Sequence, residues 1–516
     1  METTARASWL ASLALLKHPK TWVMLCLGFS AGVPILLIFS SLSLWLREAG
    51  VERATVTFFS WAALGYSFKF VWAPLVDRMA LPILGRLGRR RGWLLASQLA
   101  VIVAILGMAS VNPAGSVHAL QWMAVFAVLL GFSSATQDIV IDAYRIESAD
   151  TSMQAIMASG YIAGYRVGMI VAGAGALFLA DLWGSSAASY SYEAWRNTYG
   201  VMAAAMGLGV LTTLAIDEPA RARQDAIDVG HHAQLLLAFA ATVSVFVATF
   251  VAWGQWAEHW GWVLPGALGS LLWASVRLGL SLALGVLAAW GLARCGAVPM
   301  GVVRQTWLAP VADFFQRYGQ RTAWLLLALI GLYRISDIVL GVISNVFYQD
   351  LGFSKTEIAA AVKSFGVAVS IAGGFLGGIL SNRLGVMRGL MWGAVLSALT
   401  NLLFVALAQL GHDVRLLYAV VAADNLAAGL ASAAFVAFLS SLTQVQFTAV
   451  QYAIFSSLMT LLPKTLGGYS GGMVDALGYP GFFVLTTLLG LPVLVLVGLA
   501  KRLLPQSAGA ASPAQR

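Results

Sequence analysis

Charged residues are scarce in this chain of 516 residues: Asp, Glu, Lys and Arg make up 10% of it, whereas 59% is hydrophobic. The mean hydropathy of +0.82 is too high for a soluble domain of this length. The formal net charge of +9 does not come from long basic runs of the kind that bind nucleic acid. We therefore expect a protein whose main solvent is the lipid bilayer and which has no nucleic-acid partner.

The sequence also lacks signals of a metal site, of ATP hydrolysis and of a separate catalytic domain. It has two cysteines, Cys26 and Cys295, with no spacing typical of a metal site. It contains no G-x-x-x-x-G-K-[ST] phosphate loop, so direct ATP hydrolysis is not expected. No loop exceeds roughly 30 residues, which leaves no room for a separate catalytic domain. These absences predict a protein that is not an enzyme and that binds no metal or cofactor.

Long apolar runs are what the sequence has in abundance. A helix needs about 20 apolar residues to cross the hydrocarbon, and about fourteen such runs occur. The first, from Thr21 to Leu46, is too long for a signal-peptide core. The predicted spans start near Thr21, Ala54, Trp93, Ala119, Ala155, Thr198, Ala233, Val263, Thr322, Glu357, Gly385, Leu416, Ala449 and Gly481.

An even number of spans places both termini on the same side of the membrane. Most of the 31 Lys and Arg residues fall in the segments on that side, including the cluster Arg89 to Arg91. Because basic loops stay in the cytoplasm, we expect both termini to be cytoplasmic.

A short loop motif occurs twice, after the second and the tenth predicted spans, and we interpret both copies as gating loops. The first copy has Ala73 in place of its leading glycine and extra residues before Gly85, and the second has Asn382 in place of an acid. Both copies resemble the motif G-x-x-x-D-R-x-G-x-x-R of the major facilitator superfamily. The positions that carry the resemblance are Asp77, Arg78, Gly85 and Arg89, and then Asn382, Arg383 and Gly385.

A second repeat relates residues that lie 298 positions apart, among them Gly131 with Gly429 and Arg166 with Lys464. Transporters built from two similar halves show such repeats. We therefore expect an all-α integral membrane protein of the major facilitator type, a monomer with two six-helix halves and two extra central spans. The predicted segments are a cytoplasmic N-terminus (1–20), a first bundle (21–216), a linker with two extra spans (217–293), an amphipathic cytoplasmic connector (294–321), a second bundle (322–500) and a cytoplasmic tail (501–516).

Charged residues inside the spans are the first functional candidates, because each costs about 2.5–3.5 kcal/mol to insert. Arg166, Arg334, Asp337 and Lys464 fall near mid-span, where transporter sites usually lie. Arg334 and Asp337 are three residues apart and share a helix face. The alternatives of substrate binding, proton coupling and a static ion pair stay open for these four. Asp424 is a further candidate for a proton site.

The fourth span ends in a stripe of Asp138, Asp142 and Arg145. This stripe fits an inner gate, a proton-handling carboxylate or a salt-bridge network at a helix end. Lys69 and Lys363 lie toward span ends, so we expect that both can extend their heads to an interface. Not counting Arg277 in an extra span, the spans hold more basic than acidic groups, which suits an anionic substrate.

Further segments extend the resemblance to a narrower family. They include FKFVWAPLVDR (68–78), TQDIVIDAYRIE (136–147), LYRISDIVLG (332–341), ADNLAAG (423–429) and QYAIFSSLMTL (451–461). Together they resemble the AmpG-type muropeptide permeases, in the same order from about residue 20 to 500. The resemblance implies proton-driven import of anhydro-muropeptides across the bacterial inner membrane for cell-wall recycling and, where an inducible β-lactamase exists, supply of its induction signal.

Three other functions compete with this interpretation. A drug or metabolite exporter of the same fold is the main alternative, although the fifth span has glycines without the proline typical of such antiporters. A membrane receptor would bind without net flux and needs an output domain. A membrane-embedded transferase needs converging acidic or histidine residues, whereas the six histidines lie mostly in loops.

Overall fold

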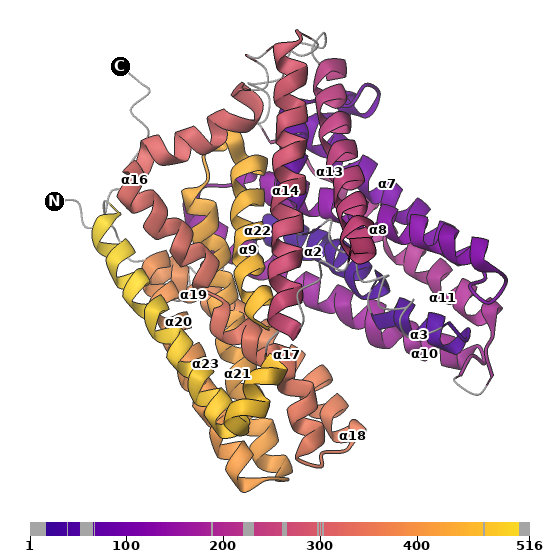
Figure 1. Cartoon of the computed structure of the whole chain (residues 1–516). Helices are drawn as coiled ribbons and strands as arrows, with labels where there is room; N and C mark the ends of the chain where they lie inside the picture. The colour runs from indigo at the N-terminus through magenta and orange to yellow at the C-terminus, as the bar shows by residue number, and fades with distance from the viewer. Residues whose placement is uncertain are drawn as a thin grey trace. The chain divides into compact units, whose positions relative to one another are not determined.

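The computed structural model describes residues 17–504 except 39, 52–65, 67, 187–188, 220–231, 261–265, 297–298, 300, 302–303 and 468–469. Every regular element in these ranges is a helix (Figure 1). The chain forms two compact units. The larger unit contains residues 1–73, 80–223 and 318–516, and the smaller contains residues 74–79 and 224–317.

The first half of the larger unit is a bundle whose longest helix, α8, has 32 residues. A 32-residue helix is about 48 Å long and exceeds the hydrocarbon thickness. The helices are α2 (Pro19–Ile38), α3 (Ser40–Glu48), η2 (Lys69–Val71), η3 (Leu84–Leu87), α7 (Arg89–Ala109), α8 (Val117–Ser148), α9 (Thr151–Ile170), η4 (Val171–Gly175), α10 (Ala176–Leu182), α11 (Tyr192–Ala205) and α12 (Gly207–Ala215).

The second half begins within α16, which belongs to the smaller unit up to residue 317 and bends at Gly319, where φ is 71°. The ninth predicted span, which starts near Thr322, is interrupted at Tyr333 and Arg334, between α16 and α17. The helices are α16 (Ala309–Leu332), α17 (Ile335–Asp350), α18 (Lys355–Ile358), η8 (Ala359–Phe365), α19 (Gly366–Leu384), α20 (Val386–Leu410), α21 (Val414–Leu442), η9 (Val445–Phe447), α22 (Thr448–Gly467) and α23 (Ser470–Leu503).

The smaller unit holds the two extra helices, α13 (His232–Trp260) and α14 (Gly266–Arg294), which run side by side in Figure 1. Arg277 of α14 donates from Nε to the Phe250 carbonyl of α13 at 2.6 Å and lies over the Phe250 ring. This arginine joins the two extra helices. The predicted connector helix is present as η7 (Arg304–Leu308) and the start of α16, although its position on a membrane face remains a prediction.

Eleven helices in the described part of the chain are long and apolar enough to span a membrane. They cover all the predicted spans of both halves except the one near Ala54, most of which lies outside the described residues. The apolar stretches of α13 and α14 are shorter, at residues 239–254 and 279–294. The all-helical membrane architecture is therefore confirmed, whereas the count of fourteen is not.

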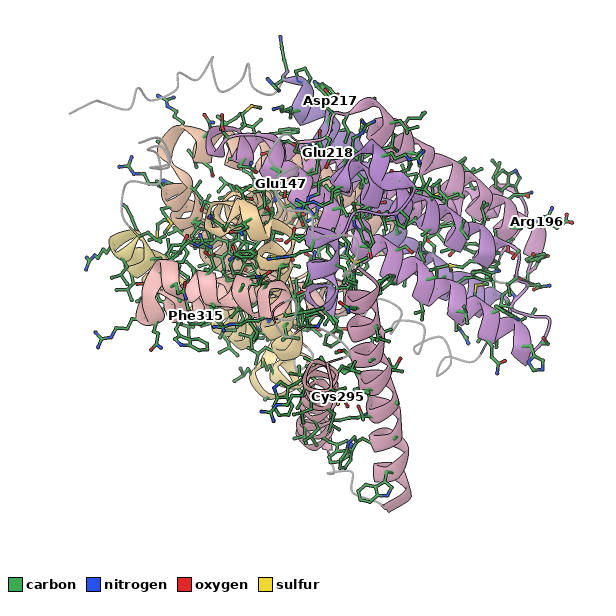
Figure 2. All side chains as sticks on the ribbon, turned by 90° about the horizontal axis from the view of Figure 1, so that it is seen from above. Glu147, Arg196, Asp217, Glu218, Cys295 and Phe315 are labelled. Atoms are coloured by element: carbon green, nitrogen blue, oxygen red, sulfur yellow. The ribbon has the colours of Figure 1, made fainter. Side chains whose placement is uncertain are left out.

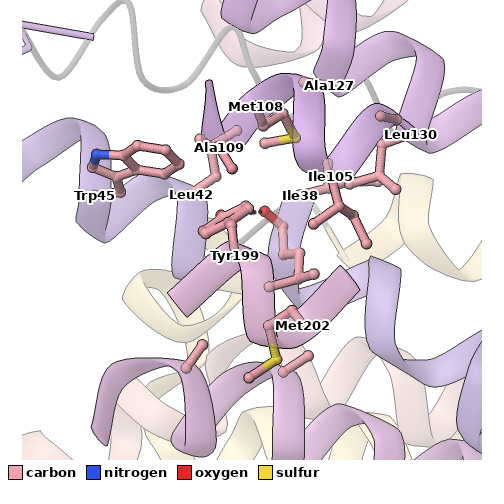
Figure 3. Packing of buried hydrophobic residues seen from close by; sticks show 14 of the residues in the cluster. Ile38, Leu42, Trp45, Ile105, Met108, Ala109, Ala127, Leu130, Tyr199 and Met202 are labelled. Atoms are coloured by element: carbon pink, nitrogen blue, oxygen red, sulfur yellow. Dashed lines mark hydrogen bonds between the residues drawn. The ribbon is translucent and has the colours of Figure 1, made fainter. Parts of the chain in front are cut away.

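Aromatic and aliphatic side chains from α2, α3, α7, α8 and α11 fill the core of the first half (Figure 3). Trp45 stacks on Trp195 with ring centroids 5.7 Å apart, and its ring centroid is 4.8 Å from that of Tyr199. The Tyr199 hydroxyl donates to the Leu37 carbonyl at 3.0 Å, so its polar end is satisfied within this core. This cluster packs α2, α3, α7, α8 and α11 around one core.

Helix starts follow ordinary capping chemistry. Ser354 and Glu357 form a reciprocal capping box at α18: the Ser354 hydroxyl accepts from the Glu357 amide, and the Glu357 carboxylate accepts from the Ser354 amide at 2.8 Å. The Ser354 amide and hydroxyl and the nearby His412 lower the pKa of Glu357. Local sequence therefore sets where this second-half helix begins.

Glycines let α9 approach α2 at backbone distance. An added Cβ at Gly164 would lie 1.9 Å from the Leu25 carbonyl oxygen, and one at Gly28 would lie 2.2 Å from the Tyr161 carbonyl oxygen. Gly160 and Gly168 repeat the pattern one turn on either side of Gly164. This is small-x-x-x-small packing, which lets membrane helices approach closely. It fixes the rotation of α9 and thereby the direction of the charged residue that α9 carries.

We predict that Gly164→Ala destabilises the protein by about 1–3 kcal/mol, because the added methyl group forces α2 and α9 apart. The measurement is the thermal unfolding midpoint of purified protein in detergent. Gly200→Ala on α11 is the matched control, since a Cβ there meets nothing within 4 Å. The control should be neutral or slightly stabilising, because alanine favours a helix over glycine by about 0.5–1 kcal/mol. Equal midpoints for the two variants would contradict the packing argument.

Candidate functional site

Lys69 and Asp138 form an ion pair inside the first half, between η2 and α8. The Tyr161 hydroxyl of α9 donates to the other oxygen of Asp138 at 2.6 Å. The Lys69 side chain is only 6% exposed, so the expectation that it extends to an interface is wrong. The Asp138 carboxylate on a neighbouring helix compensates the charge of Lys69 within the bundle, so the Lys69 ammonium group need not extend to water.

Arg334 and Asp337 pair as the three-residue spacing predicts, with Nε and Oδ2 3.0 Å apart. Arg334 also donates from Nη1 to the Ser432 hydroxyl of α21 at 2.6 Å. Asp424, also on α21, lies close enough to Asp337 and Arg334 to interact with their charges. The structure therefore brings three of the predicted site residues of the second half together.

Arg166 lies about 22 Å along α9 from the start of that helix at Thr151, near the middle of a span. Within the part of the chain that the structure describes, Arg166 has no hydrogen bond and no ion pair. Its guanidinium interacts electrostatically with Arg334 of the second half and with its neighbour Tyr165. Tyr165 in turn interacts electrostatically with Asp138.

Arg145 links the two halves at one end of the larger unit, where α8 ends and α7 begins; we call this the arginine-rich end. It is fully buried, with Nη2 3.2 Å from Asp142 of α8. Its Nη1 donates to Gln154 of α9 at 3.1 Å and to the Ser440 hydroxyl of α21 at 2.7 Å. Within the stripe, Asp138 bonds Lys69 and Tyr161, and Arg145 joins the halves through Ser440. Asp142 pairs with Arg145 and also interacts with the charges of Asp138 and Lys69.

Buried arginines also organise the first loop motif. Arg90 makes a bidentate pair with Glu147, at 2.5 and 3.0 Å, and both side chains are at most 1% exposed. Glu218 accepts from the backbone amides of Arg90 and Arg91 at the start of α7, a favourable place for an anion. Figure 2 shows Glu147 and Glu218 near each other. The arginine cluster therefore has a structural role, and the membrane orientation inferred from it remains a prediction.

The two copies of the loop motif share a glycine with left-handed backbone directly before the next helix. In the second copy it is Gly385, with φ of 89°, before α20; in the first it is Gly88, with φ of 116°, before α7. Gly85 lies within η3 instead. The extra residues of the first copy therefore shift the structural counterpart of Gly385 from Gly85 to Gly88.

The remaining motif residues lie outside the polar site described above. Asp77 is buried in α6 (Ala73–Arg78), and Arg78 donates to the Gln305 carbonyl at 3.0 Å within the smaller unit. Arg89 opens α7, and Asn382 and Arg383 lie in the last turn of α19. Their predicted gating role remains a prediction. Lys363 and Lys464 lie on η8 and α22, but their side chains are outside the described residues.

Sequence reasoning missed several polar partners that complete these contacts. Tyr161 bonds Asp138, Gln154 bonds Arg145, and the Tyr452 ring centroid lies 5.3 Å from Cζ of Arg145. All three side chains are uncharged, so a search for charged residues in spans passes over them. Ser134 and Ser432 were visible as repeat positions, and they take equivalent roles: Ser134 bonds Tyr66 and Ser432 bonds Arg334. Among the described residues no group of three His, Cys, Asp or Glu side chains could hold a metal ion.

Comparison with known proteins agrees with this architecture. The family profile described as Major Facilitator Superfamily matches residues 325–516, and the one described as Acetyl-coenzyme A transporter 1 matches residues 20–183. The anhydromuropeptide permease of Escherichia coli (strain K12) is 29% identical over 486 residues, covering 94% of this chain and 80% of that protein. The chain is a homologue of the AmpG-type permeases. The Rickettsia felis transporter AmpG 4 is 28% identical and covers 94% and 97% of the two chains.

Solved transporters share the fold of this AmpG-type homologue at low sequence identity. The proton:xylose symporter XylE bound to 6-bromo-6-deoxy-D-glucose has a TM-score of 0.57 at 15% identity, with 96% of both chains covered. FucP in the outward conformation also has a TM-score of 0.57, at 12% identity, with 94% and 99% covered. The expected major facilitator fold is confirmed, and the chain is a transporter rather than an enzyme.

We predict that Lys69→Met or Asp138→Asn alone destabilises the fold by about 3–5 kcal/mol, because each leaves one partner of an interior ion pair uncompensated. The double variant should recover most of that loss, since it removes both charges. Thermal unfolding of the three variants in detergent measures the effect. Equal melting of the double variant and the worse single variant would show that Lys69 and Asp138 do not depend on each other.

Proposed function

We propose that this chain imports peptidoglycan-derived anhydro-muropeptides, N-acetylglucosaminyl-anhydro-muramyl peptides and the related tripeptides, from periplasm to cytoplasm. In this proposal the proton gradient drives uptake across the bacterial inner membrane, and both termini are cytoplasmic. The imported sugar peptides return to cell-wall synthesis and, where an inducible β-lactamase exists, supply its induction signal.

The observation that carries the proposal is similarity along nearly the whole chain to a protein named anhydromuropeptide permease. The site chemistry supports it. Muropeptides carry peptide carboxylates, and the middle of the larger unit contains the cations Arg166 and Arg334 from opposite halves. Asp138 and Asp424 are the carboxylates available for carrying a proton, because both lie in spans beside other titratable groups.

The contacts between halves support a transport cycle that opens and closes the two ends in turn. At the arginine-rich end, Arg145 bonds Ser440, and the Ser159 hydroxyl of α9 donates to the Gly374 carbonyl of α19 at 2.9 Å. A few hydrogen bonds between small or polar residues separate more readily than an interlocked apolar core. We therefore assign this junction as the cytoplasmic gate, in its closed state.

Uptake into proteoliposomes tests the proposal directly. Purified full-length chain is reconstituted, and accumulation of labelled N-acetylglucosaminyl-anhydro-muramyl peptide is measured with and without an inward proton gradient. We expect accumulation to rise with the gradient and to collapse with a protonophore. Unlabelled acetyl-coenzyme A is the comparison solute, because the first half matches the family profile that bears its name; it should not compete.

Two outcomes would change the assignment. Uptake that the gradient does not affect would support the proposed cargo and exclude proton coupling. If folded protein reconstituted in both orientations takes up no muropeptide, the fold assignment is unaffected and the proposed cargo is wrong. In that case efflux of a drug or metabolite from loaded vesicles becomes the next measurement.

A further inference from the structure

Arg166 occupies the face of α9 that meets the second half. Ser159 and Ile162, seven and four residues earlier, share this face by helical spacing. The Ser159 hydroxyl bonds the Gly374 carbonyl at 2.9 Å, and a Cβ on Gly374 would lie 3.9 Å from Cγ2 of Ile162. Gly160, Gly164 and Gly168 occupy another face, against α2. The next position on the Ser159–Ile162 face is Arg166, which is therefore directed toward α19 and α21.

Arg334 reaches the same region from the opposite half. Its Nη1 donates to Ser432 of α21 at 2.6 Å. Gly429, three residues earlier on α21, packs backbone to backbone against Ser370 and Gly374 of α19. The α19 segment at Gly374 thus lies beside both Ile162 and Gly429, one turn from each arginine contact. This shared neighbour explains why the charges of Arg166 and Arg334 interact.

The charges in this region do not balance around Arg166. Arg334 has Asp337 at 3.0 Å. Asp424 interacts with Asp337, Arg334 and Tyr348, and Asp138 is occupied by Lys69 and Tyr161. Within the described residues no carboxylate pairs with Arg166, although a guanidinium offers five N–H donors. An uncompensated cation in a span is costly, and here it faces a second cation.

We propose that one carboxylate of the transported molecule binds between Arg166 and Arg334 and bridges the two halves. This inference rests on the proposed muropeptide cargo, whose stem peptide supplies such a group. A planar guanidinium holds a carboxylate through two parallel hydrogen bonds, which lysine does not match. Since each half contributes one arginine, the bound carboxylate replaces their repulsion by attraction. It therefore favours states in which the halves are closed around the cargo.

The test compares two ligands on purified full-length protein: anhydro-muramyl tripeptide as the free acid, and the same molecule with its peptide carboxylates converted to carboxamides. Equilibrium binding and proteoliposome uptake are measured for both. We expect the wild-type chain to prefer the acid by about ten- to a hundredfold, the range of hydrogen bonds to charged groups. Arg166→Gln should lower the affinity for the acid to that for the amide and leave the affinity for the amide unchanged.

Two further variants separate a binding role from a structural one. Arg166→Lys keeps the charge and loses the planar guanidinium, so it should retain a reduced preference for the acid. If Arg166→Gln fails to fold, Arg166→Lys replaces it in the test. Arg196→Gln is the matched control, because Arg196 is exposed on α11 at the far edge of the first half (Figure 2). It should keep the full preference.

Each remaining outcome decides against the inference. If the wild-type chain binds and imports acid and amide equally, the bridged carboxylate is wrong and the muropeptide cargo stands. If Arg166→Gln, or Arg166→Lys in its place, keeps the full wild-type preference for the acid over the amide, a residue other than Arg166 binds the carboxylate. If wild-type protein binds and imports neither ligand, both this inference and the proposed cargo fall.

Discussion

Close backbone contact between α2 and α9 is the constraint on which the site depends. Glycines at 28, 32, 160, 164 and 168 remove the side chains that would hold the two helices apart. In a membrane such contact stabilises helix pairs through packing and not through the hydrophobic effect. With one face of α9 fixed against α2, its other faces have fixed directions: Tyr161 meets Asp138, and Ser159 meets the second half.

Most buried charges in the described part of the larger unit are neutralised where they lie. Lys69 with Asp138, Arg90 with Glu147, Arg145 with Asp142 and Arg334 with Asp337 each join residues that are individually costly to bury. The first two pairs join different helices and so fix how those helices are oriented, whereas the last two are local pairs three residues apart. Arg166 differs from them, because its electrostatic neighbours are an arginine and a tyrosine.

The two halves use related positions for different partners. Ser134 and Ser432 correspond in the repeat, and each fixes a polar side chain on a neighbouring helix. In the first half that side chain is Tyr66, whereas in the second it is Arg334. An approximate repeat thus gives different polar contacts in the two halves.

Patterns in the sequence predicted the membrane environment, the helical architecture, the repeat and the Arg334–Asp337 pair, because hydrophobic run length and three-residue spacing are local properties. The four-residue spacing of Gly160, Gly164 and Gly168 is likewise a local property of the sequence. Three relations appear only in the folded chain: Lys69 is buried against Asp138, Arg145 bonds Ser440 of the other half, and Arg166 lies close enough to Arg334 for their charges to interact. These relations join residues on different helices, and the rotation of each helix follows from packing against its neighbours. No periodicity within one segment contains that information.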